Sequence, residues 1–266
     1  MNTTPKASDA IPVSAPVTTE LAGKTAAIAQ NSVFRIIDVE SGSGGTGFLH
    51  KSGKIVTAAH VVANPRIDQL KIVLSSGVFV NVAAREADPD LDLAVLTPAS
   101  AIPGTALPIY STTTVPAGMQ VLAWGFPEGY GSLTPLLTVG YVAGIDEIVV
   151  ASGKRVSRFV INAAFNRGNS GGPVIRIEDG AVIGVVSSKL APIPPYIVSA
   201  LEALTNQQSG FMYEATDAAG KKITLSEGKI VGDVLYYLRS QTQLVMGHAV
   251  STAQLVDYLR ANKIDP

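Results

Sequence analysis

The stretch RFVINAAFNRGNSGGPVIRI, residues 158–177, places a serine in a glycine-rich loop between two apolar segments. The flanking segments, RFVINAA (158–164) and GPVIRI (172–177), are short and rich in β-branched residues, so each predicts a strand. Three glycines, at positions 168, 171 and 172, surround Ser170. Because glycine tolerates backbone conformations that other residues avoid, such a loop can turn several amide groups toward one point. The stretch therefore predicts two strands joined by a tight loop with a chemical role.

Similar short apolar segments continue on both sides of this loop. Short β-branched runs alternate with Gly, Pro, Asn and Asp at the interval typical of all-β barrels or sandwiches, and no βαβ alternation interrupts them. Nine further strand candidates are SVFRIIDV (32–39), KIVTAA (54–59), LKIVLSS (70–76), VFVNVAAR (78–85), LDLAVL (91–96), QVLAWG (120–125), LTVGYVAGI (137–145), EIVVAS (147–152) and AVIGVVSS (181–188). The chain is therefore predicted to be all-β through this region.

Other segments interrupt or flank the strands. A proline-containing N-terminal part predicts a flexible tail, and Ser251 is expected to cap a C-terminal helix. The predicted units are a tail (1–17), a short helix (18–30), a connecting stretch (97–117), a helix (197–206), a hairpin (211–225), a second helix (229–241), a strand (243–250) and a terminal helix (252–262). Residues 191–240 thus form an α/β insertion.

Composition excludes several classes of function. The chain has 266 residues, with 47% hydrophobic, 15% charged and a net charge of −1, so it predicts a globular core and no nucleic-acid partner. No apolar run approaches the roughly 18 residues that span a membrane. The absence of cysteine excludes disulfides, thiolate catalysis and cysteine-ligated zinc. We expect no metal and no cofactor, and the lack of a visible signal peptide favours a cytoplasmic protein. The oligomeric state is left open.

A serine hydroxyl becomes a useful nucleophile only when a base takes its proton, so a histidine is needed near Ser170. His60, in IVTAAHVV (55–62), follows a predicted strand and is preferred for that context. His50 follows GFL (47–49) and precedes a predicted hairpin turn, His248 lies within a predicted strand, and both are interpreted as structural.

An acid is expected to orient the imidazole, and Asp88, Asp90 and Asp92 are all candidates. Alternation in LDLAVL (91–96) would place Asp92 on one strand face with Ala94 and Leu96. An aspartate on such an apolar face is costly unless it has a partner. Asp92 is therefore the preferred acid.

Taken together, these motifs resemble the trypsin-like serine proteases, and within them the HtrA-like bacterial branch. The residues that carry the resemblance are GSGGTGF (42–48), TAAHVV (57–62), DLAVL (92–96), WGFPEG (124–129), TVGYVAG (138–144), INAAFNRGNSGGPV (161–174) and GVVSS (184–188). The order His, Asp, Ser also matches.

The resemblance implies a chymotrypsin-like fold of two antiparallel six-stranded β-barrels. The protease domain would cover 18–250, with an N-terminal barrel at about 30–115 and a C-terminal barrel at about 116–250. The insertion would occupy 191–240, and the C-terminal helix, 251–266, would pack on the domain. The active site would lie where the two barrels meet.

It also implies roles for individual residues. Ser170 would attack a peptide carbonyl, with His60 as general base and then acid, and Asp92 would hold His60. The amides of Gly168 and Ser170, with Asn169 between them, would form the oxyanion hole. Asn169 stands where zymogen-type trypsins have an aspartate that pairs with a newly cut N-terminus, so activation by that cleavage is not expected.

Substrate contacts follow from the same resemblance. Ala164, followed by Phe165, would lie at the base of the primary specificity pocket, and its lack of charge predicts small or medium apolar residues before the scissile bond. Ser187, Ser188 and Lys189 would form the edge that pairs with substrate backbone, where Lys189 either favours acidic side chains or is a solvated lysine.

The chain departs from the HtrA pattern in two respects. No PDZ-sized segment follows the terminal helix, and the 191–240 insertion either limits access to the cleft or is a packed surface decoration. The leading prediction is a serine endopeptidase acting on polypeptides. The alternatives are a catalytically silent binding module on a protease fold and a serine esterase.

Overall fold

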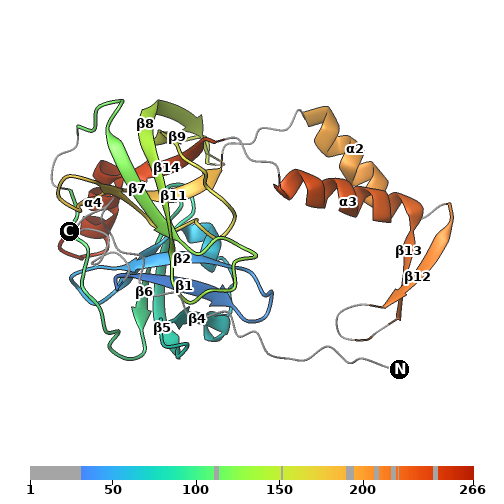
Figure 1. Ribbon diagram of the computed structural model, residues 1–266, viewed down its shortest axis with the longest axis horizontal. Helices are drawn as coiled ribbons and strands as arrows, with labels where there is room; N and C mark the ends of the chain where they lie inside the picture. The colour runs from blue at the N-terminus through green and yellow to red at the C-terminus, as the bar shows by residue number, and fades with distance from the viewer. Residues whose placement is uncertain are drawn as a thin grey trace, which may run out of the picture.

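The computed structural model describes residues 31–110, 114–150, 152–189, 195–206, 210–216, 220, 222–241 and 245–266. The predicted tail (1–17) and N-terminal helix (18–30) lie outside these residues. Two closed barrels of antiparallel strands lie side by side, and an arm of helices and a hairpin extends away from them (Figure 1).

The first barrel is built from the strands between residues 33 and 98. In chain order they are β1 (Val33–Asp38), β2 (Gly44–Leu49), β3 (Ile55–Thr57), β4 (Leu70–Val73), β5 (Phe79–Asp88) and β6 (Leu93–Pro98), joined around the barrel as β1-β2-β3-β6-β5-β4. Two short 3-10 turns, η1 (Ala59–Val62) and η2 (Ile67–Gln69), connect strands. Buried aliphatic side chains such as Ile36, Ile55 and Leu70 fill its interior, as expected of a small barrel.

The second barrel takes most of the remaining strands. They are β7 (Gln120–Gly125), β8 (Leu136–Val149), β9 (Arg155–Asn162), β10 (Pro173–Arg176), β11 (Val182–Lys189) and β14 (Gly247–Ser251), in the order β10-β11-β14-β9-β8-β7. The fold prediction of two six-stranded antiparallel barrels is therefore confirmed.

The seam between the barrels is closed by an apolar cluster that draws side chains from both barrels and by the C-terminal helix α4 (Thr252–Ala261). The Ser251 hydroxyl accepts a hydrogen bond from the Gln254 amide at 3.4 Å and so caps α4. Leu255 and Leu259 of α4 are fully buried. The Tyr258 hydroxyl donates to the Glu86 carbonyl of β5 at 2.8 Å. The helix therefore follows a strand of one barrel and is bonded to the other.

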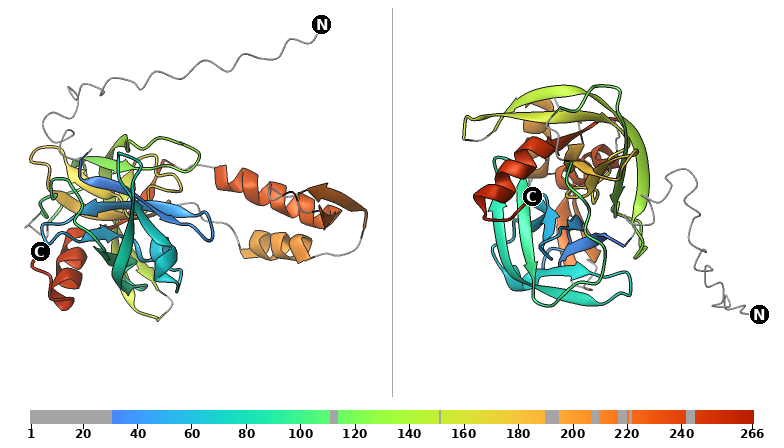
Figure 2. Two further views of the ribbon diagram at one scale, coloured as in Figure 1. Left: turned by 90° about the horizontal axis from the view of Figure 1, so that it is seen from below. Right: turned by 90° about the vertical axis from the view of Figure 1, so that its left-hand side faces the viewer.

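The inserted arm contains α2 (Pro195–Asn206), the hairpin β12 (Met212–Thr216) and β13 (Lys222–Ser226), and α3 (Glu227–Gln241). It extends away from the barrels in two perpendicular views (Figures 1 and 2). Gly232 of α3 packs closely against α2, because a Cβ there would lie 2.6 Å from Thr205 Oγ1. The glycine that weakens the helical pattern in the sequence is thus a contact point. Within the described residues, no helix has the length and apolar character to cross a membrane.

Two strand predictions need correction. The strands expected at 137–145 and 147–152 are one continuous strand, β8, which bends at a bulge between Val142 and Gly144. Strand β2 is absent from the predicted set because three of its six residues are glycines. A Cβ at Gly45 would lie 2.9 Å from the Ser170 carbonyl oxygen, so the missing side chains allow β2 to approach the loop that carries the serine.

Candidate active site

His60 and Asp92 form the best-defined polar contact at the seam. The Nδ1 atom of His60 lies 2.9 Å and 3.0 Å from the two carboxylate oxygens of Asp92. The His60 backbone amide also donates to Asp92 Oδ1 at 3.1 Å. The side chain of Asp92 is 15% exposed, whereas that of His60 is 51% exposed. The sheltered carboxylate therefore fixes one edge of the ring, and the other edge faces the solvent side.

The backbone position of Asp92 differs from the prediction. Asp92 precedes β6, which begins at Leu93, and adopts a φ of +58°. The expected alternation does not apply either, because Leu93, Ala94, Val95 and Leu96 are all buried. This left-handed conformation is uncommon outside glycine but is tolerated by aspartate. It turns the carboxylate out of the strand toward His60. The backbone of the turn, and not strand alternation, therefore brings Asp92 to its partner.

Ser187 of β11 contributes a further hydrogen bond to the same carboxylate. Its hydroxyl donates to Asp92 Oδ2 at 2.5 Å. Burial opposes ionisation of Asp92, but the hydrogen bonds and charge interaction with His60, together with the Ser187 hydroxyl, hold the pKa of Asp92 below its ordinary value. The carboxylate is therefore ionised at neutral pH. It can only accept, so His60 Nδ1 carries the proton and Nε2 is left as an acceptor.

Arg158 is a buried cation behind this pair that the sequence analysis did not identify. It lies on β9, is 2% exposed and donates from Nη2 to the Asp90 carbonyl at 3.2 Å. Its Nε and Nη1 atoms have no hydrogen-bond partner among the described residues. Burial lowers the pKa of Arg158, while the charges of Asp92 and Asp88 oppose that shift. Arg158 thus supports, from the second barrel, the turn that carries Asp92.

Ser170 lies in the glycine-rich loop and lines the same cavity as His60. Its hydroxyl donates to the Ser187 carbonyl at 3.1 Å, and within the described chain no hydrogen bond joins it to His60. The expected link between serine and imidazole is therefore absent in this conformation. The hydroxyl takes a backbone acceptor instead.

The loop directs two amide groups by fixing the carbonyls before them. The Arg167 carbonyl accepts from the Glu128 amide at 2.7 Å, and the Asn169 carbonyl accepts from the Gly172 amide at 2.9 Å. In a trans peptide the N–H points opposite to the C=O. The amides of Gly168 and Ser170 therefore point away from these contacts, and neither donates to any acceptor in the described residues. The Asn169 amide is different, since it donates to the Asn166 carbonyl at 3.1 Å.

Gly168 cannot be replaced without disturbing this loop. Its φ is +91°, and a Cβ there would lie 2.2 Å from the Phe126 carbonyl oxygen. Asn169, which stands in place of an aspartate, is 5% exposed, and its Oδ1 has no hydrogen-bond partner among the described residues.

Thr46 of β2 connects the loop to the first barrel and was also missed. Its hydroxyl donates to the Gly168 carbonyl at 2.6 Å and accepts from the Phe126 amide at 3.0 Å. Its backbone amide donates to the Ser170 carbonyl at 2.8 Å. Thr46 is completely buried. The motif GSGGTGF (42–48) is the sequence signal that contains it, but its contacts with Phe126 and Gly168 lie 80 and 122 residues away along the chain.

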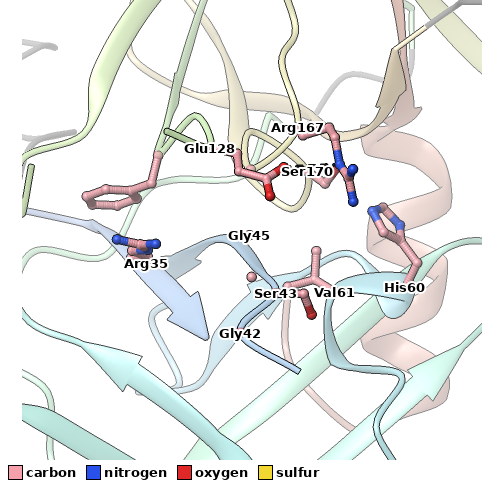
Figure 3. A pocket seen from close by; sticks show the side chains of 12 residues that line it. Arg35, Gly42, Ser43, Gly45, His60, Val61, Glu128, Arg167 and Ser170 are labelled. Atoms are coloured by element: carbon pink, nitrogen blue, oxygen red, sulfur yellow. Dashed lines mark ion pairs between the residues drawn. The ribbon is translucent and has the colours of Figure 1, made fainter. Parts of the chain in front are cut away.

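A cavity of about 310 Å³ contains both His60 and Ser170. Figure 3 shows Arg167 and Glu128 above it and the glycines of the β1–β2 hairpin below. The Arg167 Nε atom lies 3.1 Å from Glu128 Oε2, in a solvent-exposed ion pair. Among the described residues none of the cavity lining comes from the arm, so this arrangement does not support the hypothesis that the insertion limits access.

The residues predicted to bind substrate occupy different environments. Ala164 is half-buried after the end of β9, and the backbone of Ser187 to Lys189 forms the end of β11. Phe165 is 1% exposed and belongs to the core of the second barrel, so its position does not support a substrate contact. The side chains of Ser188 and Lys189 lie outside the described part of the structure.

The other two histidines are structural, as predicted. His50 is 1% exposed, and its Nδ1 lies 2.9 Å from the Ser52 hydroxyl in a turn. His248 is 8% exposed, with Nε2 at 3.4 Å from Asp146 Oδ2. Neither lines the cavity that contains Ser170.

Comparison with known proteins identifies the family. A family model described as a trypsin-like peptidase domain matches residues 45–185, which is more than half of the chain. The chain belongs to the trypsin-like peptidase family. The family resemblance inferred from the motifs is confirmed.

Curated relatives of this trypsin-like peptidase include HtrA proteases. The mitochondrial serine protease HTRA2 of Drosophila grimshawi is 29% identical over 215 residues, covering 76% of this chain and 49% of the relative. The corresponding protein of Drosophila virilis is 27% identical over 212 residues, with coverage of 76% and 49%. The chain thus spans about half the length of the curated relatives that it matches.

Solved structures share the fold of this trypsin-like peptidase. The Rv3671c protease of M. tuberculosis in its active form superposes with a TM-score of 0.55 at 20% identity, covering 88% of this chain and 93% of the other. The HtrA-type protease AlgW with a tripeptide gives a TM-score of 0.57 at 20% identity, with coverage of 90% and 62%. At this level of identity the likeness concerns the fold alone.

Proposed function

We propose that this trypsin-like peptidase is a serine endopeptidase in which Ser170, His60 and Asp92 form the catalytic triad. The observation that carries the proposal is the placement of His60 between a half-buried, ionised Asp92 and a cavity that Ser170 also lines. Asp92 holds the imidazole in the tautomer that leaves Nε2 as a base.

In the first half of the reaction, the Ser170 hydroxyl rotates from the Ser187 carbonyl toward His60 Nε2. As Ser170 Oγ bonds to the substrate carbonyl carbon, His60 accepts the hydroxyl proton, and the carbonyl oxygen becomes an oxyanion. The amides of Gly168 and Ser170 donate to that oxyanion. His60 then gives its proton to the leaving amine as the C–N bond breaks, which leaves an acyl-enzyme on Ser170.

In the second half, water attacks the acyl carbon and His60 takes the water proton. The second tetrahedral intermediate collapses, the bond to Ser170 Oγ breaks, and His60 returns the proton to that oxygen. The product is a carboxylic acid, and the enzyme regains its starting protonation state. Asp92 remains ionised throughout and stabilises the transient imidazolium.

For the residue before the scissile bond, we propose small or medium apolar side chains. Ala164 brings no charge to the predicted specificity pocket, so an arginine or lysine side chain would find no carboxylate at that position. Two series of internally quenched peptides, with Ala, Val and Leu or with Arg and Lys before the cleaved bond, test this. Faster cleavage of the basic series would refute the assignment of Ala164.

The triad itself is tested with a fluorophosphonate probe and a peptide substrate. Ser170→Ala should abolish labelling, and Ser170→Ala and His60→Ala should each lower kcat/KM by about a thousandfold or more, since the triad acts as a unit. His50→Gln is a matched histidine control outside the cavity and should retain turnover. Wild-type protein that is folded but neither labelled nor active would refute the proposal.

One observation favours a second candidate, a binding module on a protease fold. The Ser170 hydroxyl is engaged by the Ser187 carbonyl rather than by His60. If that contact persists with substrate, a peptide is held without being cut. Labelling of Ser170 by the probe excludes this candidate, whereas peptide binding without labelling supports it.

A further inference from the structure

The cavity that contains Ser170 extends away from the β11 edge and along the β1–β2 hairpin. Its wall there consists of Arg35 on β1 and of residues 42–45, three of which are glycines. A Cβ placed on Gly42 would meet no atom within 4 Å, so this part of the wall borders open space. Figure 3 shows Arg35 and His60 at opposite ends of the cavity. The hollow is therefore longer than the reacting atoms alone need.

This part of the cavity faces the leaving half of a substrate. The argument rests on the proposed endopeptidase function, in which the acyl half pairs with the backbone of Ser187 to Lys189. The Ser170 hydroxyl contacts that edge through the Ser187 carbonyl at 3.1 Å. An extended peptide that crosses Ser170 must continue on the other side of it. There it meets the hairpin glycines and then Arg35.

The charges in the cavity are not balanced. Two arginines and one glutamate line it, and the glutamate is taken by Arg167, whose Nε lies 3.1 Å from Glu128 Oε2. The half-buried Arg35 makes no ion pair or side-chain hydrogen bond with any other described residue. A guanidinium in a partly sheltered cavity is suited to bind a carboxylate through two parallel hydrogen bonds.

We propose that Arg35 selects substrates with an acidic side chain in the first three residues after the scissile bond. The paired Glu128 does not oppose this preference, because Arg167 offsets its charge. A lysine at the same substrate position would face an unpaired like charge. This selectivity acts on the residues after the scissile bond. It is independent of Ala164, which is proposed to select the residue before that bond.

Internally quenched peptides with an identical acyl half test the proposal. Asp, Asn or Lys is placed in turn at each of the three positions after the bond, and kcat/KM is measured. At the responsive position the wild type should cleave the Asp peptide about fivefold faster than the Asn peptide, and the Lys peptide more slowly still. Arg35→Gln should remove the order, and Arg35→Glu should invert it in favour of Lys.

The ratio of rates within one variant cancels differences in the amount of folded enzyme. Arg155→Glu, a charge reversal on the exposed face of β9, is the control for net charge and should keep the wild-type order. Equal rates for the three peptides in the wild type, or an Asp preference that survives in Arg35→Glu, would overturn the proposal. Failure of the wild type to cleave any peptide would instead refute the endopeptidase function.

Discussion

Replacing Thr46 by valine tests whether the first barrel holds the oxyanion loop of the second in its working shape. The substitution keeps the side-chain shape but removes the hydroxyl that donates to the Gly168 carbonyl at 2.6 Å and accepts from the Phe126 amide at 3.0 Å. The backbone contact from Thr46 to Ser170 stays. The change therefore loosens the loop without removing any group that touches substrate.

The magnitudes follow from the two lost hydrogen bonds. At about 1 kcal/mol each, the free energy of unfolding should fall by about 2 kcal/mol, which lowers Tm by about 4–8 °C in a chain of this size. Removal of a whole oxyanion donor costs a hundredfold or more in kcat, so a loosened loop should cost about tenfold to a hundredfold in kcat/KM, mainly through kcat.

Thr252→Val is the matched control. Thr252 is also buried, and its hydroxyl donates to the Tyr110 carbonyl at 3.0 Å, far from the cleft. It should lose about 1 kcal/mol of stability with little change in kcat/KM per folded molecule. Both variants are assayed on one peptide well below their Tm, with active sites counted by fluorophosphonate labelling. Equal kcat/KM for the two variants would show that Thr46 contributes only to stability.

Three further predictions concern the loop and the carboxylate. Gly168→Ala should lower kcat/KM by about a hundredfold or more because the methyl group would meet the Phe126 carbonyl at 2.2 Å; near-normal turnover would contradict the loop geometry. The pKa of Asp92 is lowered in the folded state, so its stabilising effect should be complete above about pH 5 and disappear as pH falls below about 4. Urea unfolding of wild type and Asp92→Asn at several pH values measures the difference in their free energies of unfolding. A difference that shrinks between pH 7 and 5 would refute the reasoning. Arg158→Met should lower kcat/KM severalfold, because it removes the hydrogen bond from Nη2 to the Asp90 carbonyl at 3.2 Å that supports the turn carrying Asp92, whereas Arg158→Lys should lose less; unchanged kcat/KM in Arg158→Met would contradict this support.

Local sequence patterns were sufficient for most of the fold. Short β-branched runs bounded by turn residues mark strands such as β1, β7 and β9, because those signals act over a few neighbouring residues. They fail for β2, where Gly44, Gly45 and Gly47 are needed for close packing rather than for strand propensity. They also divide β8 at Asp146, although a bulged strand continues through that residue.

The candidate site could be predicted only in part from the sequence, because local patterns do not report contacts between distant residues. His60, Asp92 and Ser170 belong to motifs that can be recognised along the chain. The contacts of Thr46 and Arg158 join residues of different barrels, so no local pattern reports them. Asp92 was chosen from an alternation that the strand does not follow, since its left-handed backbone is set by the turn before β6.

The hydrogen bond from the Tyr258 hydroxyl of α4 to the Glu86 carbonyl bears on how a substrate can reach the active site. This C-terminal helix follows a strand of the second barrel and is hydrogen-bonded to a strand of the first, so it opposes separation of the two barrels. We therefore expect the barrels to stay together during turnover, so that a substrate is met at the cavity that contains Ser170 rather than between separated barrels.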